Sequence, residues 1–203
     1  MRAFAEEALY KEAGLYKYGM TAEIIGYAVN YVHQILDSID AQLMSGADSR
    51  LSELVELANL SAIIGNLFRT GVCRSSGGIF LPNAPHTYPD IIANKSYVDA
   101  RDVEIKVALE NNKPKGHLVK PGPHITVRYV LVAENNVYTR GKSTRGVVPW
   151  IWEVRIGELE ANHFNFSNTE GDSGKTAVIN AAGMAALSVV YFDRARCPRV
   201  RGI

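Results

Sequence analysis

The chain has 203 residues, of which 47% are hydrophobic and 21% charged, and its formal net charge is +1 at pH 7. A chain of this length and composition can bury one substantial hydrophobic core, so it is neither intrinsically disordered nor collagen-like. We therefore expect a single domain over residues 1–203, with a helical part over 1–70 and a sheet core with a closing helix over 71–203.

We expect a cytoplasmic protein with no membrane segment. Residues 1–7 contain two glutamates where a signal peptide needs apolar residues, so no export signal is predicted. The longest uncharged run, residues 176–192, is shorter than the roughly 18 to 20 apolar residues that cross a bilayer. Cys73 and Cys197 are the two cysteines of the chain, which gives neither a disulfide framework nor a zinc site, and we expect reduced thiols.

Helical periodicity dominates the first third of the chain. Apolar residues recur at helical spacing over 3–13 and 21–39, and Thr21 is suited to cap the second of these helices. A third helix is predicted from Asp48 or Ser49 to Phe68, before a glycine-rich stretch ends the pattern.

Strand signals follow from about residue 79. β-branched and aromatic residues mark five strands, at 79–81, 91–92, 103–109, 124–133 and 150–159. Residues 175–192 are predicted to form a last helix, capped by Ser173 or Thr176. The order of these elements predicts an α/β fold with a central mixed β-sheet flanked by helices.

Three ionisable residues of the strand region form a candidate site. Asp90 lies in Tyr-Pro-Asp-Ile-Ile, and Glu104 and Lys106 lie in Val-Glu-Ile-Lys-Val. Residues i and i+2 of a strand project from the same face, so Glu104 and Lys106 share one face while Ile105 and its apolar neighbours bury the other. Two carboxylates and an ammonium at one place can hold a divalent cation and orient a water molecule.

The pair Pro89-Asp90, followed by Glu104-Ile105-Lys106, resembles the motif of the PD-(D/E)XK nuclease superfamily, which includes most type II restriction endonucleases. The resemblance covers roughly residues 77–132 and implies a restriction-endonuclease-like core. It implies that Asp90, Glu104 and the backbone carbonyl of Ile105 bind Mg²⁺, and that Lys106 orients the attacking water. It also implies a homodimer that cleaves both strands of double-stranded DNA at a short symmetric site.

In nucleases of this type, a glutamate from the helix before the Pro-Asp pair often approaches the metal. Glu53 and Glu56 lie in the predicted third helix, and Glu56 is the preferred candidate because it borders the apolar side. Simple solvent exposure is the alternative explanation for both residues, and it is the favoured one for Glu53.

Positive charge is concentrated between residues 106 and 145, as a polyanion-binding surface requires. The loop after Lys106 and a second turn around residues 140–145 combine cations, amides and a histidine that can reach phosphates or base edges. The predicted DNA-binding residues are Asn111, Lys113, Lys115, His117, Lys120, Arg140, Lys142 and Arg145. An ordinary hydrophilic loop would also contain proline and glycine, but it would not concentrate lysines.

Several functions are compatible with these residues. The hypothesis that we carry forward is a Mg²⁺-dependent type II restriction endonuclease. A structure-specific nuclease, such as a junction resolvase or a repair endonuclease, would use the same three residues. A DNA-binding protein without catalysis would keep only the basic loops. In a protein unrelated to DNA, Glu104 and Lys106 would be solvated residues of a surface strand.

Overall fold

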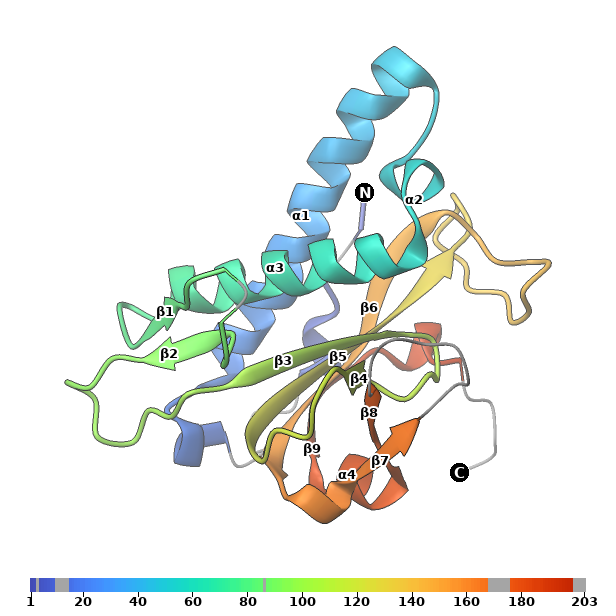
Figure 1. The fold of residues 1–203 in the computed structure, drawn as a ribbon. Coiled ribbons are helices and arrows are strands. Elements are labelled where there is room, and N and C mark those ends of the chain that lie inside the picture. Colours follow the sequence, from blue (N-terminus) through green and yellow to red (C-terminus); the bar gives the residue numbers. More distant parts are fainter. Residues whose placement is uncertain (3, 10–14, 86, 168–175, 199–203) are drawn as a thin grey trace.

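The computed structural model describes residues 1–203 except 3, 10–14, 86, 168–175 and 199–203 (Figure 1). Its centre is a four-stranded sheet with the order β3-β5-β6-β9. These strands span Glu104–Leu109, Gly122–Val132, Val148–Leu159 and Ser188–Phe192. β3 is parallel to β5, and the other neighbours are antiparallel. The prediction of a mixed central sheet flanked by helices is therefore confirmed, and β3 lies at an edge of this sheet.

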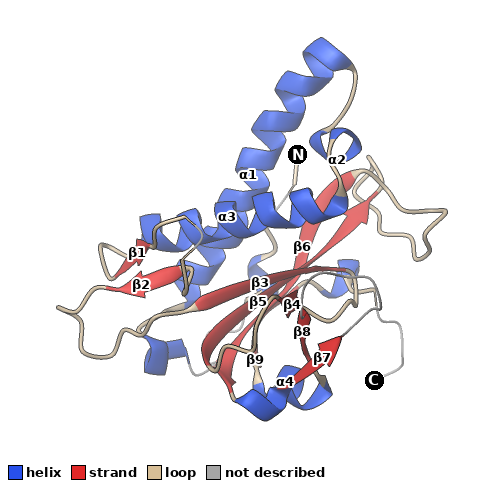
Figure 2. Cartoon of the chain, in the orientation of Figure 1, coloured by secondary structure: helices blue, strands red, loops and turns tan. Residues whose placement is uncertain are grey.

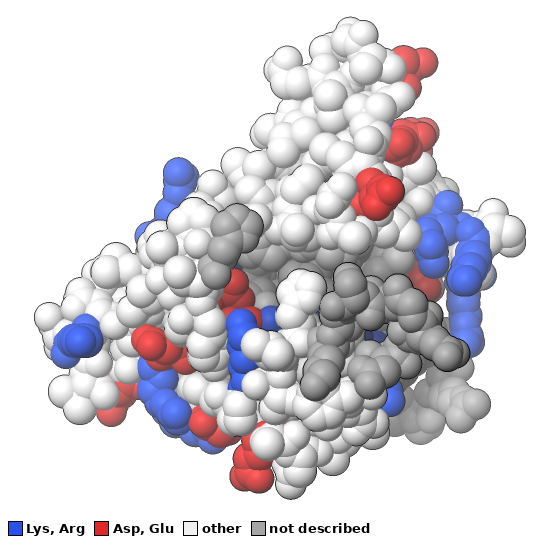
Figure 3. Space-filling model, viewed as in Figure 1, with Lys and Arg blue, Asp and Glu red and all other residues white. Residues whose placement is uncertain are grey.

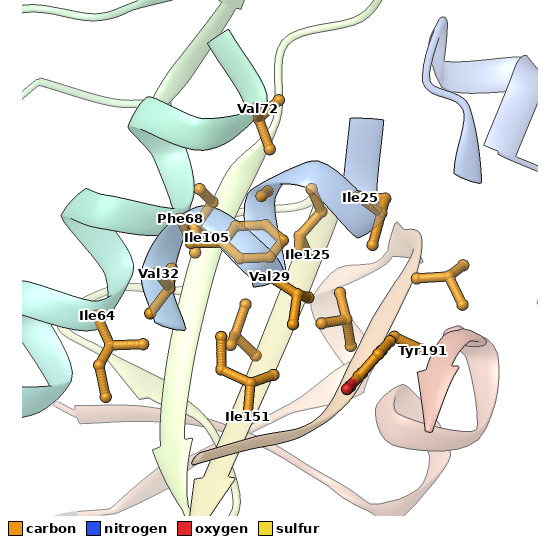
Figure 4. Close-up of a cluster of buried hydrophobic side chains, with 14 of the residues drawn as sticks. Ile25, Val29, Val32, Ile64, Phe68, Val72, Ile105, Ile125, Ile151 and Tyr191 are labelled. Atoms are coloured by element: carbon orange, nitrogen blue, oxygen red, sulfur yellow. The ribbon is translucent and has the colours of Figure 1, made fainter. Parts of the chain in front are cut away.

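Two helices, α1 (Ala22–Ala47) and α3 (Leu57–Ser75), cover one face of the central sheet (Figure 2). Thr21 caps α1 as predicted, because its hydroxyl accepts a hydrogen bond of 3.3 Å from the N–H of Ile24. The apolar stripes of both helices meet the inward residues of the sheet (Figure 4). This core includes Ile25, Val29, Val32, Ile64, Phe68, Val72, Ile105, Ile125, Ile151 and Tyr191.

A small second sheet lies on the other side of the central sheet from α1 and α3 (Figure 1). It has the order β4-β8-β7, with strands Lys115–Gly116, Thr176–Ile179 and Phe164–Ser167. The short helix α4 (Ala181–Ala186) follows β8, and Asn180 caps it through a hydrogen bond from the N–H of Gly183. Leu159, Phe164, Ile179, Met184 and Leu187 form the apolar cluster of this region.

A two-stranded ribbon connects α3 to the edge of the central sheet. Strands β1 (Phe80–Pro82) and β2 (Ile91–Ala93) are antiparallel. A single antiparallel bridge between Ile91 and Val103 then joins the ribbon to the start of β3. The remaining described elements are α2 (Leu51–Leu54) and the 3₁₀ helices Glu6–Ala8, Leu15–Tyr18, Ala161–His163 and Arg194–Arg196. No helix in the described part of the chain is long and apolar enough to cross a membrane.

Three of the predicted elements were wrong. Residues 176–192 form β8, α4 and β9 rather than one helix, because β-branched residues are frequent at both ends of the run and Asn180 starts a new helix between them. Ser173 lies outside the described residues. The third helix is interrupted at Val55, whose extended backbone separates α2 from α3. In the predicted helix 3–13, the described residues contain a 3₁₀ turn at Glu6–Ala8, and Leu9 forms an antiparallel bridge with Tyr191.

Candidate active site

The bridge between β2 and β3 brings Asp90 and Glu104 together. The N–H of Ile91 donates to the carbonyl of Val103 at 3.0 Å, and the N–H of Val103 donates back to Ile91 at 3.0 Å. Asp90 and Glu104 each lie one residue from this doubly bonded pair. In an antiparallel pair, residues next to a hydrogen-bonded pair face each other closely across the strands. Two carboxylates separated by thirteen residues in sequence therefore become neighbours.

Asp90 is fixed by the backbone of the edge strand. Its Oδ2 accepts a hydrogen bond of 2.7 Å from the N–H of Ile105. The carbonyl of a strand residue points to the same side as its N–H, so the Ile105 carbonyl also faces the open edge where Asp90 lies. The predicted metal ligands Asp90, Glu104 and the Ile105 carbonyl are thus close together in the structure.

Glu104 and Lys106 share one face of β3, as their spacing predicts. The Lys106 ammonium forms an ion pair with Glu104 Oε1, and the side chain of Ile105 points into the core on the other face. Glu104 is only 4% exposed. Lys120 reaches the same carboxylate from the end of the loop that precedes β5, with Nζ 3.6 Å from Glu104 Oε1. Lys120, predicted as a DNA contact, is therefore a member of the site itself.

The charges around Asp90 act against each other. Burial raises the pKa of the Asp90 carboxyl, and the negative charge of Glu104 raises it further. The hydrogen bond from Ile105 and the positive charges of Lys106 and Arg69 lower this pKa but do not cancel the increase. The ionised form of Asp90 is therefore disfavoured in the folded protein, because burial and the charge of Glu104 outweigh the nearby positive charges.

Tyr88 connects the two loops that flank the site. Its hydroxyl donates to the carbonyl of Pro121 at 3.2 Å, and the Lys120 ammonium lies 4.3 Å from the centre of its ring. Figure 3 shows acidic and basic side chains next to each other on this face, below α3. Tyr88 was not among the predicted residues, although its position two residues before Asp90 places it beside the site.

The site fits a small divalent cation that keeps part of its water shell. Within the described ranges, no three His, Cys, Asp or Glu side chains are grouped to enclose a metal ion. Mg²⁺ does not need such a cage, because it is typically bound by one or two carboxylates, several waters and the phosphates of the substrate. The negative charge of Glu104 raises the pKa of Asp90, and a cation between the two carboxylates would offset this repulsion.

The structure does not bring Glu56 to this site. Glu56 is exposed and precedes the first residue of α3, and Glu53 accepts a hydrogen bond from the N–H of Arg50 at the start of α2. The residue of α3 whose charge acts on Asp90 is Arg69. It lies thirteen residues after Glu56, roughly 20 Å along the helix at about 1.5 Å per residue. The helix therefore contributes a cation where the resemblance implies a carboxylate.

The predicted DNA-binding residues differ in their environment. The exposed residues among them are Lys113, Lys115, His117, Arg140 and Lys142. Asn111 is half-buried, and Arg145 is bound to the carboxylate of Glu110 at 3.0 Å. The loop that carries the first three does not project freely, because Lys115 pairs with Val178 in β4 and β8.

A buried polar strip continues from the site across the central sheet. His124 and Thr126 on β5 stand in register with Glu104 and Lys106 and are fully buried. The His124 Nδ1 hydrogen bonds to the Gly122 carbonyl at 2.9 Å, and burial lowers the pKa of this imidazole. The sequence analysis did not predict this strip. The alternation of side chains along β5 already places His124 and Thr126 on the face of the strand that Ile125 and Val127 do not occupy.

The comparisons with known proteins assign no family to this arrangement. No model of a known protein family matches the chain, and a search among curated proteins finds no relative.

Proposed function

We propose that this protein is a Mg²⁺-dependent endonuclease that hydrolyses phosphodiester bonds of double-stranded DNA at a short specific site, as type II restriction endonucleases do. The observation that carries the proposal is the grouping of Asp90, Glu104 and Lys106 at one edge of a mixed sheet. The order of these residues in the chain is that of the PD-(D/E)XK motif. Two carboxylates and a lysine at one sheet edge suit the hydrolysis of a phosphodiester.

Each residue of the site has a chemical role in this proposal. Asp90, Glu104 and the Ile105 carbonyl would hold the Mg²⁺, which when bound neutralises phosphate charge and lowers the pKa of a coordinated water. Lys106 orients the attacking water and stabilises the negative charge that develops on the phosphate. Release of the Lys106 and Lys120 ammonium groups from Glu104 would free them for these contacts with substrate.

The exposed cations supply the wider DNA contact. Lys113, Lys115, Arg140 and Lys142 are exposed and can approach phosphates without breaking an ion pair to any described residue, whereas Arg145 would first have to leave Glu110. Cleavage of both strands at a symmetric site requires two active sites, so the proposal includes a homodimer whose twofold axis coincides with that of the DNA.

The direct test is incubation of the purified protein with a plasmid of known sequence, with and without Mg²⁺. We expect discrete linear fragments in Mg²⁺ and none in EDTA. Glu104→Gln and Lys106→Ala should each lower the cleavage rate by at least about 100-fold, the scale of losing an electrostatic contact to the transition state.

The matched control is Lys95→Ala, because Lys95 is an exposed lysine of the segment between β2 and β3. It should cleave at the wild-type rate. Full activity in EDTA would contradict the metal-dependent mechanism. Cleavage confined to branched or damaged DNA would replace the restriction endonuclease by a structure-specific nuclease.

A further inference from the structure

Arg69 is placed beside the candidate site by the close packing of α3 on β3. Gly65 lies one turn before Arg69, and a Cβ atom at Gly65 would come 3.1 Å from the Cγ2 of Val107. The missing side chain therefore lets the helix approach the strand closely. Arg69 lies four residues later on the same side of the helix, which is the side that packs on β3. Its charge acts on the Asp90 carboxyl.

The guanidinium of Arg69 lacks the carboxylate partner that other shielded arginines have. Its Nε is buried without a hydrogen-bond partner, as are the Nε atoms of Arg50 and Arg155, but those two residues form ion pairs, whereas no carboxylate of the described residues lies within ion-pair distance of Arg69. By contrast, four other arginines with restricted exposure each contact a carboxylate, namely Arg2, Arg128, Arg145 and Arg155. Arg69 thus differs from the arginines that serve internal ion pairs.

An unpaired guanidinium whose Nε is shielded from water carries a desolvation cost that a bound anion would offset. The flat guanidinium offers parallel N–H donors whose spacing matches the oxygens of a phosphate. Lys120 reaches the carboxylates from the loop before β5, whereas Arg69 comes from α3. The two residues therefore supply positive charge to the carboxylates from two different elements.

We propose that Arg69 binds a backbone phosphate of the substrate next to the phosphate that is cleaved, and so sets the register of the strand over Asp90 and Glu104. This inference rests on the proposed nuclease function. It assigns to α3 a substrate contact that the PD-(D/E)XK resemblance does not provide. In this arrangement Lys106 acts at the reacting phosphate, and Arg69 holds its neighbour.

The test uses duplex oligonucleotides that contain the cut site mapped on the plasmid, each with one phosphate replaced by a neutral methylphosphonate. Binding is measured in Ca²⁺ and cleavage in Mg²⁺ for the wild type, Arg69→Gln and Arg74→Gln. Arg74 is the matched control, because it lies on the same helix but is exposed and its guanidinium lies 5.3 Å from the centre of the Tyr31 ring.

For the wild type and Arg74→Gln, we expect neutralisation of one phosphate beside the cut to weaken binding about 10- to 100-fold, the range for a charge-assisted hydrogen bond. Arg69→Gln should bind unmodified DNA more weakly by the same factor, and the methylphosphonate at that one position should not weaken its binding further. All other phosphates should keep their effect.

Two results would overturn the inference while leaving the nuclease function intact. One is an Arg69→Gln protein that binds and cuts like Arg74→Gln. The other is a weakened Arg69→Gln protein with a lowered Tm that still responds to every methylphosphonate as the wild type does. A wild type that binds duplex DNA without cutting it would contradict the proposed function, and a methylphosphonate scan along that duplex would then show whether Arg69 contacts one particular phosphate. Absence of both binding and cleavage would contradict both.

Discussion

Asp90 combines a candidate catalytic role with a cost in stability. Its pKa in the folded protein lies above the value of an unfolded carboxyl, so its contribution to stability is present below about pH 4 and is lost as the pH rises through the folded pKa. At pH 7 the ionised carboxylate therefore destabilises the fold. An asparagine at this position could still accept the hydrogen bond from Ile105 without the charge.

We accordingly expect Asp90→Asn to abolish cleavage and to raise the Tm at pH 7, with the gain disappearing below about pH 4. Thermal melts over a pH series would measure this difference. Asp99→Asn is the matched control, because Asp99 is exposed, and its Tm should follow the wild type. A lower Tm for Asp90→Asn at pH 7 would show that the negative charge is compensated in the folded protein.

His33 makes the fold sensitive to acid. It is fully buried, its Nε2 accepts a hydrogen bond of 3.1 Å from the N–H of Ile151, and burial together with Arg2 and Arg196 lowers its pKa to about 3. Because the folded pKa is depressed, the stabilisation is complete above the unfolded pKa of about 6.5 and is lost as the pH falls towards 3.

Within this window each pH unit should lower the unfolding free energy by roughly 1 kcal/mol through His33 alone. In His33→Gln the glutamine can keep an acceptor near Ile151 but cannot be protonated, so its stability should fall less steeply between pH 6 and pH 4. Urea unfolding at several pH values would give the slopes. His117→Gln, which changes an exposed histidine, should retain the wild-type slope.

At the scale of elements, the contact between α1 and α3 depends on a glycine. A Cβ atom at Gly71 would lie 2.7 Å from the Cα of Ala28, closer than packed atoms come. Gly71→Ala should therefore push the helices apart and cost about 1 to 3 kcal/mol. In Gly46→Ala the new methyl meets nothing within 4 Å, so helix propensity should instead stabilise the protein by about 0.5 to 1 kcal/mol. Denaturant unfolding of both variants would check the opposite signs.

The elements that periodicity predicted well are those that face one core. α1, β5 and β6 have long apolar stripes at the period of a helix or strand. The predicted positions of β5 and β6 are close to the observed ones, and the start of α1 was predicted at the right place, but the helix predicted over 21–39 extends to Ala47. The prediction of one helix over residues 175–192 was wrong because the alanines and glycine of this run follow neither the helical nor the strand period. The break at Val55 was not predicted because the apolar residues on either side continue the helical spacing across it.

At the scale of the whole molecule, the sequence could predict which residues of β3 share a face but not what surrounds them. Glu104 and Lys106 are two residues apart, so strand geometry alone relates them. Arg69 and Lys120 are far away in the chain, and only tertiary packing brings them near the carboxylates. The misplaced Glu56 has the same cause, since its distance from Asp90 depends on where α3 crosses the sheet.

A metal that binds the folded protein alone should stabilise it by mass action. We expect Mg²⁺ to raise the unfolding free energy of the wild type, by about 2.7 kcal/mol at one hundred times its Kd. Glu104→Gln should lose most of this gain, and calorimetric melts across a Mg²⁺ titration would measure it. Equal stabilisation of both proteins would show that the ion binds elsewhere.

The hydrogen bond from Ile105 to Asp90 also occupies a backbone donor at the edge of the central sheet. β3 is an edge strand, and the outward N–H groups of such a strand can pair with a strand of another molecule and start aggregation. The Asp90 carboxylate occupies one of these donors and places a negative charge beside it. Asp90→Ala would free this donor, so it should lower solubility on storage as well as activity, whereas Asp90→Asn should retain solubility.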